Sequence, residues 1–203
     1  AKLALSRKAL VNDDLGAFGD FAQSAGRMAA ETENKVLVDL LLSNPKLAET
    51  GKSLFHDDHR NKEGARLDDS GIGLDGMRAA FRMQKGLDGK TPINATARFL
   101  LVSTDLEPTV DTLMTKILDV NSAWRPEGLK DLELLVEPRL PAKSAYAFVD
   151  PARLACFEYS YLSSAQGPQI ASQPDWDTLG MEFRVYLDFG AGAIDFRGAY
   201  QWA

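Results

Sequence analysis

Apolar positions recur at three- and four-residue steps along the first fifth of the chain. Between Asn12 and Ser43 this spacing predicts one long amphipathic helix. Asn12 and Asp13 can cap its first turn, and the sequence Ser43-Asn44-Pro45 ends it. With a rise of about 1.5 Å per residue, roughly 30 residues span about 45 Å, which is more than a compact domain of this size needs. The helix therefore predicts an elongated molecule.

Two shorter helices follow. The first runs from about Leu74 to Gln84 and ends at a turn around Gly86. For the second, we expect Asp105 to be the cap and Pro108 to lie in the first turn. The segment Lys46–Ser70 is polar and rich in turn residues, and we expect about 25 irregular residues there, well above the usual loop length. Irregular segments of this length usually carry a function.

Strands are predicted where apolar positions alternate or form short runs. The predicted strands are residues 2–10, Phe99–Val102, Leu132–Val136, Tyr146–Val149, Phe157–Leu162, Met181–Phe189 and Ala193–Tyr200. The first has no partner upstream, and the turn residues Gly190-Ala191-Gly192 predict that the last two pair as a hairpin. Twelve of the eighteen aromatic residues follow Lys143, so the C-terminal part is expected to be strand-rich. Together these elements predict an α+β fold.

Composition narrows the class of protein. The 203 residues include 45% hydrophobic and 26% charged residues, as in an ordinary globular protein. There are 23 Lys and Arg against 29 Asp and Glu, a net charge of −6, so we expect no sequence-specific nucleic acid binding. We also expect no membrane association, because no apolar run approaches the ~20 residues of a spanning helix and no signal-peptide core is visible. The single cysteine, Cys156, is expected to be buried and inert.

The sequence His56-Asp57-Asp58-His59 is the most conspicuous polar cluster and contains both histidines. Histidine and carboxylate are ligands for divalent metals, so one hypothesis is a metal-dependent hydrolase that uses His56, Asp58 and His59. Against it, the chain has no HExxH helix, and adjacent aspartates cannot both point inward in a regular element. We favour a structural loop, anchored by Leu54 and Phe55, in which His56, Asp58 and Asn61 satisfy backbone groups of the turn. We therefore expect no metal and no cofactor.

The sequence gives little support for other catalytic motifs. Gly71-Ile72-Gly73-Leu74-Asp75-Gly76 matches G-x-G-x-x-G, but Asp68-Asp69-Ser70 precedes it instead of an apolar strand. There is no Gly-x-Ser-x-Gly elbow, and Cys156 lies in an aromatic run away from both histidines in sequence. The residues alone therefore predict a protein that is not an enzyme, with no catalytic residues.

Several segments, taken in order, resemble one family. They are Ser6–Phe18, Gly51–His59 with Asn61, Gln84–Gly89, Arg98–Val102, Val136–Leu140 and Leu187–Tyr200. Their order and spacing are similar to those of the major capsid proteins of Mu-like tailed phages and prophages, including the type encoded as the C-terminal part of a prohead protease fusion. The resemblance extends over nearly the whole chain.

The resemblance implies the Hong Kong 97-like capsid fold, with a spine helix, a peripheral sheet and an axial domain. It implies that residues 1–60 form the peripheral strand, spine helix and following loop. Residues 61–178 would form a mainly axial α+β domain, and 179–203 a C-terminal hairpin that returns to the peripheral domain. The residues expected to have assembly or structural roles are Asn12, Asp13, Asp14, Phe55, His56, Asp58, His59, Arg139 and Arg197.

The function implied is that of a major head protein that assembles with itself into pentamers and hexamers enclosing phage DNA. Other phage head proteins are possible partners, and the location implied is the virion capsid, assembled in the cytoplasm of the bacterial host. Family members carry an N-terminal arm and extended loop upstream of the segment Ser6–Phe18, so we expect this chain to be a truncated subunit. Two alternatives stay open, the metal-dependent hydrolase and an interaction module whose aromatic C-terminal sheet binds a different protein.

Overall fold

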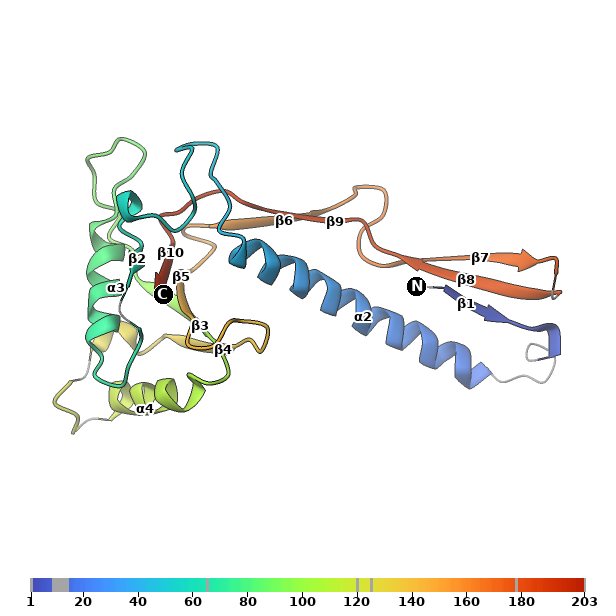
Figure 1. The fold of residues 1–203 in the computed structure, drawn as a ribbon, viewed down its shortest axis with the longest axis horizontal. Coiled ribbons are helices and arrows are strands. Elements are labelled where there is room, and N and C mark those ends of the chain that lie inside the picture. Colours follow the sequence, from blue (N-terminus) through green and yellow to red (C-terminus); the bar gives the residue numbers. More distant parts are fainter. Residues whose placement is uncertain are drawn as a thin grey trace. The chain divides into compact units, whose positions relative to one another are not determined.

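The computed structural model describes residues 2–8, 15–64, 66–119, 121–124, 126–177 and 179–202 (Figure 1). Its helices are α2 (Leu15–Leu42), α3 (Ile72–Met83) and α4 (Glu107–Leu118), with short 3-10 turns at Asp57–His59 and Glu127–Leu129. Its strands are β1 (Lys2–Leu5), β2 (Lys62–Glu63), β3 (Ala97–Val102), β4 (Glu133–Val136), β5 (Ala145–Val149), β6 (Phe157–Tyr161), β7 (Gln169–Asp175), β8 (Gly180–Tyr186), β9 (Phe189–Ala193) and β10 (Ala199–Trp202). The predicted α+β class is confirmed.

The chain forms two compact units. Unit 1 comprises Ala1–Asp39 and Tyr159–Ala191, and unit 2 comprises Leu40–Glu158 and Gly192–Ala203. Both units therefore combine an early and a late part of the sequence. The assignment of three sequence segments to peripheral and axial domains stays a prediction. No helix among the described residues is long and apolar enough to cross a membrane.

In unit 1, a three-stranded antiparallel sheet has the order β1-β8-β7. The first strand, which lacked a partner upstream, pairs with β8 so that Leu3 faces Phe183. At the base of β8, a Cβ on Gly180 would lie 1.9 Å from the carbonyl oxygen of Leu5, so only glycine allows the two backbones to come this close. Sequence reasoning missed β7, because its side chains are mostly exposed and polar and give no apolar alternation.

The predicted C-terminal hairpin is wrong in its pairing. Residues 190–192 are not a turn but lie within β9, and neither Gly190 nor Gly192 adopts a positive φ. Strand β9 pairs with β6, β8 pairs with β1 and β7, and β10 joins a different sheet. The physical reason is that glycine permits a turn without requiring one. Strand β8 instead forms a hairpin with β7, which directly precedes it, while β9 and β10 pair with strands further away in the sequence.

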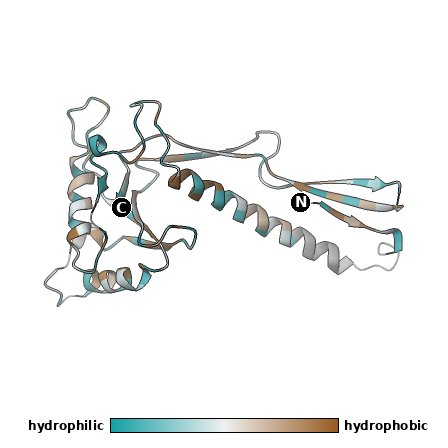
Figure 2. Cartoon of the chain, viewed as in Figure 1, coloured by the Kyte–Doolittle hydropathy of each residue, from teal (hydrophilic) through white to brown (hydrophobic). Residues whose placement is uncertain are grey.

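The long helix α2 matches the predicted one closely. The residues expected to cap it and to mark assembly there, Asn12, Asp13 and Asp14, lie outside the described residues. Ala25, Ala29 and Val38 are buried along the helix, and the apolar run at its C-terminal end stands out in brown in Figure 2. Tyr161 of β6 hydrogen-bonds to Glu33, whose carboxylate raises the pKa of the tyrosine. This contact joins β6 to the helix inside unit 1.

Unit 2 is built around a five-stranded mixed sheet with the order β2-β10-β5-β3-β4. Its core lies where α3 and α4 pack against the sheet. The largest fully buried side chains include Phe81 and Met77 of α3, Leu113 of α4, Leu100 of β3 and Trp202 of β10. Both helices were predicted from their apolar spacing, and their buried positions follow that spacing.

The predicted cap of α4 is wrong. The helix begins after Leu106, and no side chain caps it. The Asp105 carboxylate instead accepts hydrogen bonds from the Ser103 hydroxyl at 2.6 Å and from the backbone N–H of Lys143 at 2.9 Å. The hydrogen bond from Ser103 and then the one from Lys143 lower the pKa of Asp105. Asp105 therefore joins the start of the helix to the loop before β5.

Two leucines of α4 test where the core lies. Leu113 is fully buried and Leu118 is 59% exposed. We expect Leu113→Ala to lower the free energy of unfolding of unit 2 by about 2–5 kcal/mol, because it leaves a cavity, and Leu118→Ala to change it by less than about 1 kcal/mol. Urea denaturation followed by tryptophan fluorescence measures both. Equal effects of the two substitutions would contradict this packing.

Candidate functional site

The loop that connects α2 to α3 in unit 2 is ordered by its own side chains. Asn44 uses both ends of its side-chain amide on Phe55: its oxygen accepts the backbone N–H at 2.8 Å, and its nitrogen donates to the carbonyl at 3.1 Å. The ring of Phe55 is buried, with its centroid 5.5 Å from that of Tyr146 on β5. These contacts close the loop and anchor it to the sheet, as expected for Phe55.

His59 lies at the centre of the loop and is 5% exposed. Its ring stacks on Phe196, with centroids 3.8 Å apart and planes 10° from parallel. Nδ1 lies 3.2 Å from the carbonyl oxygen of Leu54, and Nε2 lies 3.2 Å from Oγ1 of Thr50. Both ring nitrogens are therefore engaged within the loop.

Asn61 is almost completely buried and joins three parts of the chain. Its Nδ2 donates to the carbonyls of Leu54 at 2.8 Å and Phe196 at 3.3 Å, while Oδ1 accepts the N–H of His56 at 3.2 Å. The side chain of Gln84, at the end of α3, donates to the carbonyl of His59 at 2.7 Å. The expectation that Asn61 satisfies backbone groups is confirmed, whereas sequence reasoning missed Gln84.

Arg197 is a buried cation beside His59 and Phe196, and these three residues with Glu49 and Asp195 are called the Arg197 cluster. It donates to Asp195 at 2.7 Å and to Glu49 at 2.6 Å, and its guanidinium lies 4.9 Å from the centre of the Phe196 ring. Burial alone would lower the pKa of Arg197, but the hydrogen bonds and charges of Glu49 and Asp195 raise it instead. Sequence reasoning missed Glu49, because nothing local links it to a residue 148 positions away.

The three residues of the metal hypothesis lie close together in the loop. The ring centroids of His56 and His59 are 5.8 Å apart, and Nδ1 of His56 lies 3.7 Å from the Asp58 carboxylate. His56 accepts the backbone N–H of Asp58 at 3.1 Å through Nδ1, and the carboxylate of Asp58 pairs with Lys52. The hydrogen bond and charge of Lys52 lower the pKa of Asp58. In the part of the chain that the structure describes, no three His, Cys, Asp or Glu side chains are placed to hold a metal. The geometry therefore gives the hydrolase hypothesis no support.

Arg139 belongs to a different feature, the turn after β4. Its guanidinium donates to Glu137 at 2.9 Å, and its backbone N–H donates to the same carboxylate oxygen at 3.0 Å. Of the sequence-predicted residues, His59 and Arg197 both contact the Phe196 ring, while Phe55 packs against Tyr146. His56 and Asp58 lie at the more exposed rim of the loop.

A groove of about 390 Å³ lies beside the cluster. One wall is the tight turn after α3, in which the Asp88 carboxylate accepts hydrogen bonds from the Thr91 hydroxyl and from the backbone N–H groups of Lys90 and Thr91 at 2.9 Å each. The Thr91 hydroxyl and then these two N–H groups lower the pKa of Asp88 to about 2. The floor includes His59, Phe196 and Arg197.

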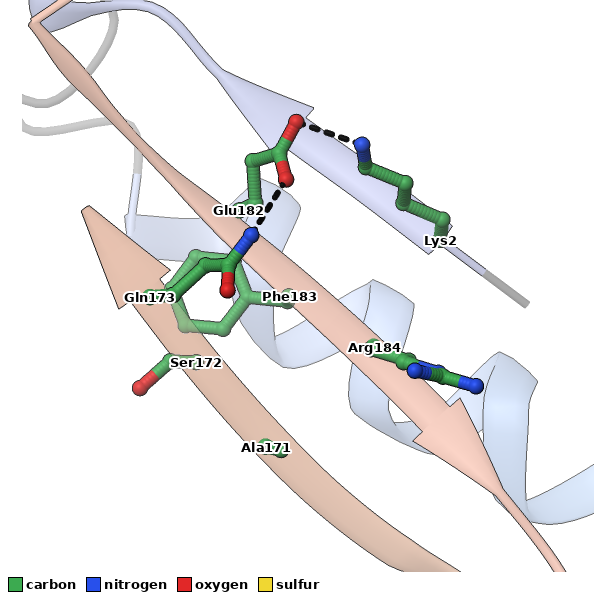
Figure 3. Close-up of a pocket in the computed structure, with 7 residues that line it drawn as sticks. All are labelled: Lys2, Ala171, Ser172, Gln173, Glu182, Phe183 and Arg184. Atoms are coloured by element: carbon green, nitrogen blue, oxygen red, sulfur yellow. Dashed lines mark hydrogen bonds and ion pairs between the residues drawn. The ribbon is translucent and has the colours of Figure 1, made fainter. Parts of the chain in front are cut away.

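A second, larger pocket lies on the sheet of unit 1 (Figure 3). Glu182 of β8 lies between Lys2 of β1, 2.5 Å away, and Gln173 of β7, which donates to it at 3.0 Å. The hydrogen bonds from Lys2 and then Gln173 lower the pKa of Glu182. These contacts link neighbouring strands, and they hold the sheet together instead of offering a reactive group.

Comparison with solved structures shows a shared fold. A phage-related protein from Bordetella bronchiseptica RB50 matches with a TM-score of 0.61 at 11% identity, over 100% of this chain and 72% of that one. A structure from Mycobacterium phage Che8 matches with a TM-score of 0.55 at 14% identity, over 100% and 68%. A virus-like particle from Pyrococcus furiosus matches with a TM-score of 0.53 at 12% identity, over 100% and 73%.

The sequence comparisons agree with this fold. A family model described as phage capsid protein matches residues 1–202. No curated protein matches the chain.

The Arg197 cluster can be tested against an exposed ion pair of the same loop. We expect Arg197→Met to lower the free energy of unfolding by about 2–3 kcal/mol, because it leaves two carboxylates beside an apolar ring without a cation. Lys52→Met removes the exposed pair with Asp58 and should cost less than about 1 kcal/mol. Chemical denaturation measures both. A small effect of Arg197→Met would show that the cluster does not hold the loop.

The turn of Asp88 gives a pH prediction. Because its pKa is lowered from 3.8 to about 2 in the folded chain, the ionised carboxylate stabilises the turn above pH 4. That contribution is lost as the pH falls through about 2. An NMR titration of the Asp88 carboxyl should show this low midpoint, and Thr91→Val should raise it by removing the hydroxyl donor. An Asp88 midpoint near its ordinary value would contradict the geometry of the turn.

Proposed function

We propose that this chain, which belongs to the phage capsid protein family, assembles with copies of itself into the capsomers of a phage head. The family match over residues 1–202 is the observation that carries the proposal. Three solved structures, two of them named as phage-related or from a phage and one as a virus-like particle, support the same fold. The chain is accordingly a structural subunit of a capsid.

More specifically, we propose a major head protein of the Mu-like type. The ordered segments from Ser6–Phe18 to Leu187–Tyr200 support this subtype. Its location would be the virion capsid, after assembly in the cytoplasm of the bacterial host. The pentamers and hexamers of such a shell would enclose phage DNA, and other head proteins are proposed as further partners.

The proposed role is structural and not enzymatic. The histidines and carboxylates that could have formed a reactive centre are engaged in loop contacts, as with His59 and Asp58. The net charge of −6 suits a wall that surrounds polyanionic DNA without adhering to it. A shell also needs no single tight interface, because many modest contacts between identical subunits act together.

Self-assembly can be tested directly on the 203-residue chain. We expect sedimentation velocity to show species larger than a monomer that grow with protein concentration, and negative-stain electron microscopy to show rings or shells. The variant Leu113→Ala serves as a control for non-specific aggregation, because any increase caused by unfolding should be greater in that variant. A monomer at every concentration would argue against self-assembly of this 203-residue chain.

A further inference from the structure

The hairpin of β7 and β8 ends in an exposed apolar tip. Trp176 is 88% exposed and Leu179 is 63% exposed, and both lie between the two strands. Asp177 is exposed beside Trp176. A tryptophan is large and mostly apolar, so leaving it in water is unfavourable unless another surface covers it.

Backbone features order both ends of the tip. Leu179 adopts φ 51°, a left-handed conformation that bulky L-residues rarely adopt and glycine tolerates freely. The N–H of Asp177 donates to the carboxylate of Asp175 at 3.1 Å, which orders the turn. Below it, the close approach of Gly180 to Leu5 fixes the base of the hairpin. Strained residues of this kind often mark functional positions.

The groove of unit 2 has exposed apolar side chains and cations, which complement the apolar and acidic residues of the tip. Met83 and Leu87 line it and are 68% and 84% exposed. Arg60 and Lys85 also line it, and neither has an ion-pair partner among the described residues. Its remaining charged lining residues, Asp58 and Arg197, are both paired. The volume of about 390 Å³ is within the ~300–1,000 Å³ of pockets that hold small ligands.

The groove and the two strands that carry the tip are ordered by contacts within the chain. The Asp88 turn fixes one wall of the groove, and the stacked His59, Phe196 and Arg197 fix its floor. The sheet register fixes the hairpin. Preorganised surfaces lose little conformational entropy on binding, which favours association through a small contact.

We propose that the tip of one copy, Trp176 with Asp177 and Leu179, docks into the groove of a second copy between Met83, Leu87, Arg60 and Lys85. The apolar side chains would cover each other, and the carboxylate of Asp177 would lie against the groove cations. Two different surfaces meet in such a contact, so each copy can bind one neighbour through its tip and another through its groove, as a ring or shell requires. The inference rests on the proposed self-assembly.

The first test compares single variants of the full chain by sedimentation velocity. We expect Trp176→Ser to weaken self-association by about 30-fold or more, as for a buried aromatic anchor. The groove variant, with Met83→Ser and Leu87→Ser, should have a similar effect. Ile170→Ser on β7 and Leu118→Ser on α4 remove exposed apolar side chains elsewhere and should change association by less than about threefold. Circular dichroism checks that each variant folds.

The second test mixes two disabled copies. The Trp176→Ser variant keeps its groove, and the double groove variant keeps its tip. Neither variant should therefore self-associate when it is alone in solution. Their equimolar mixture should form one-to-one complexes and stop there. Charge reversal gives an independent check: Lys85→Glu and Asp177→Lys should each weaken association, and mixing the two variants should restore it.

The outcomes separate this inference from the proposed function. If the unmodified chain assembles and Trp176→Ser assembles equally well, the docking is wrong and self-assembly stands. If Trp176→Ser prevents assembly but the mixture forms no complex, the tip meets another surface and the assignment of the groove is wrong. If only an added protein of another kind binds the tip, docking between copies is wrong. A monomeric unmodified chain counts against both proposals.

Discussion

The buried contact between the loop after α2 and residues 195–201 is the interaction on which unit 2 depends. Arg197 and Glu49 are 148 positions apart, and Asn61 and Phe196 are 135 apart, yet both pairs are hydrogen-bonded. The chain between them contains α3, α4 and most of the five-stranded sheet. The contact therefore closes the unit as a whole. The entropic cost of closing a loop rises only slowly with its length, so a contact between such distant residues is possible once the core has formed.

This closure also decides which side chains remain available for chemistry. The nitrogens of His59 and the amide of Asn61 satisfy groups that would otherwise be buried without partners. Leaving a buried donor or acceptor unpaired costs about 1–3 kcal/mol, so these side chains are fixed by the stability of the fold. What the cluster leaves exposed is its apolar rim, at Met83 and Leu87. An ordered polar interior thus underlies an exposed apolar rim.

Sequence reasoning predicted the features that neighbouring residues determine and missed those that depend on distant contacts. The helices α2, α3 and α4 were predictable because one apolar face recurs along each of them. Strand β7 was not, because both of its faces are exposed, and the pairing of β8 and β9 was not, because a glycine run fits a strand as well as a turn. In the site, Phe55 and Asn61 were predictable from the turn itself. The inward orientation of His59, and not of His56, depends on Phe196, which no local pattern connects to the loop.

A shell subunit has to combine stable folding with contacts that are weak one at a time. If each contact were as large as a domain core, misplaced subunits could not leave, whereas small preorganised contacts permit correction and gain strength by number. Each unit is stabilised by its own internal contacts. The Arg197 cluster orders unit 2, and the close pairing of β1 with β8 orders unit 1. Small apolar surfaces such as Trp176 and Leu87 stay exposed outside these contacts. A closed assembly of identical copies repeats such contacts by symmetry, so that each one acts many times.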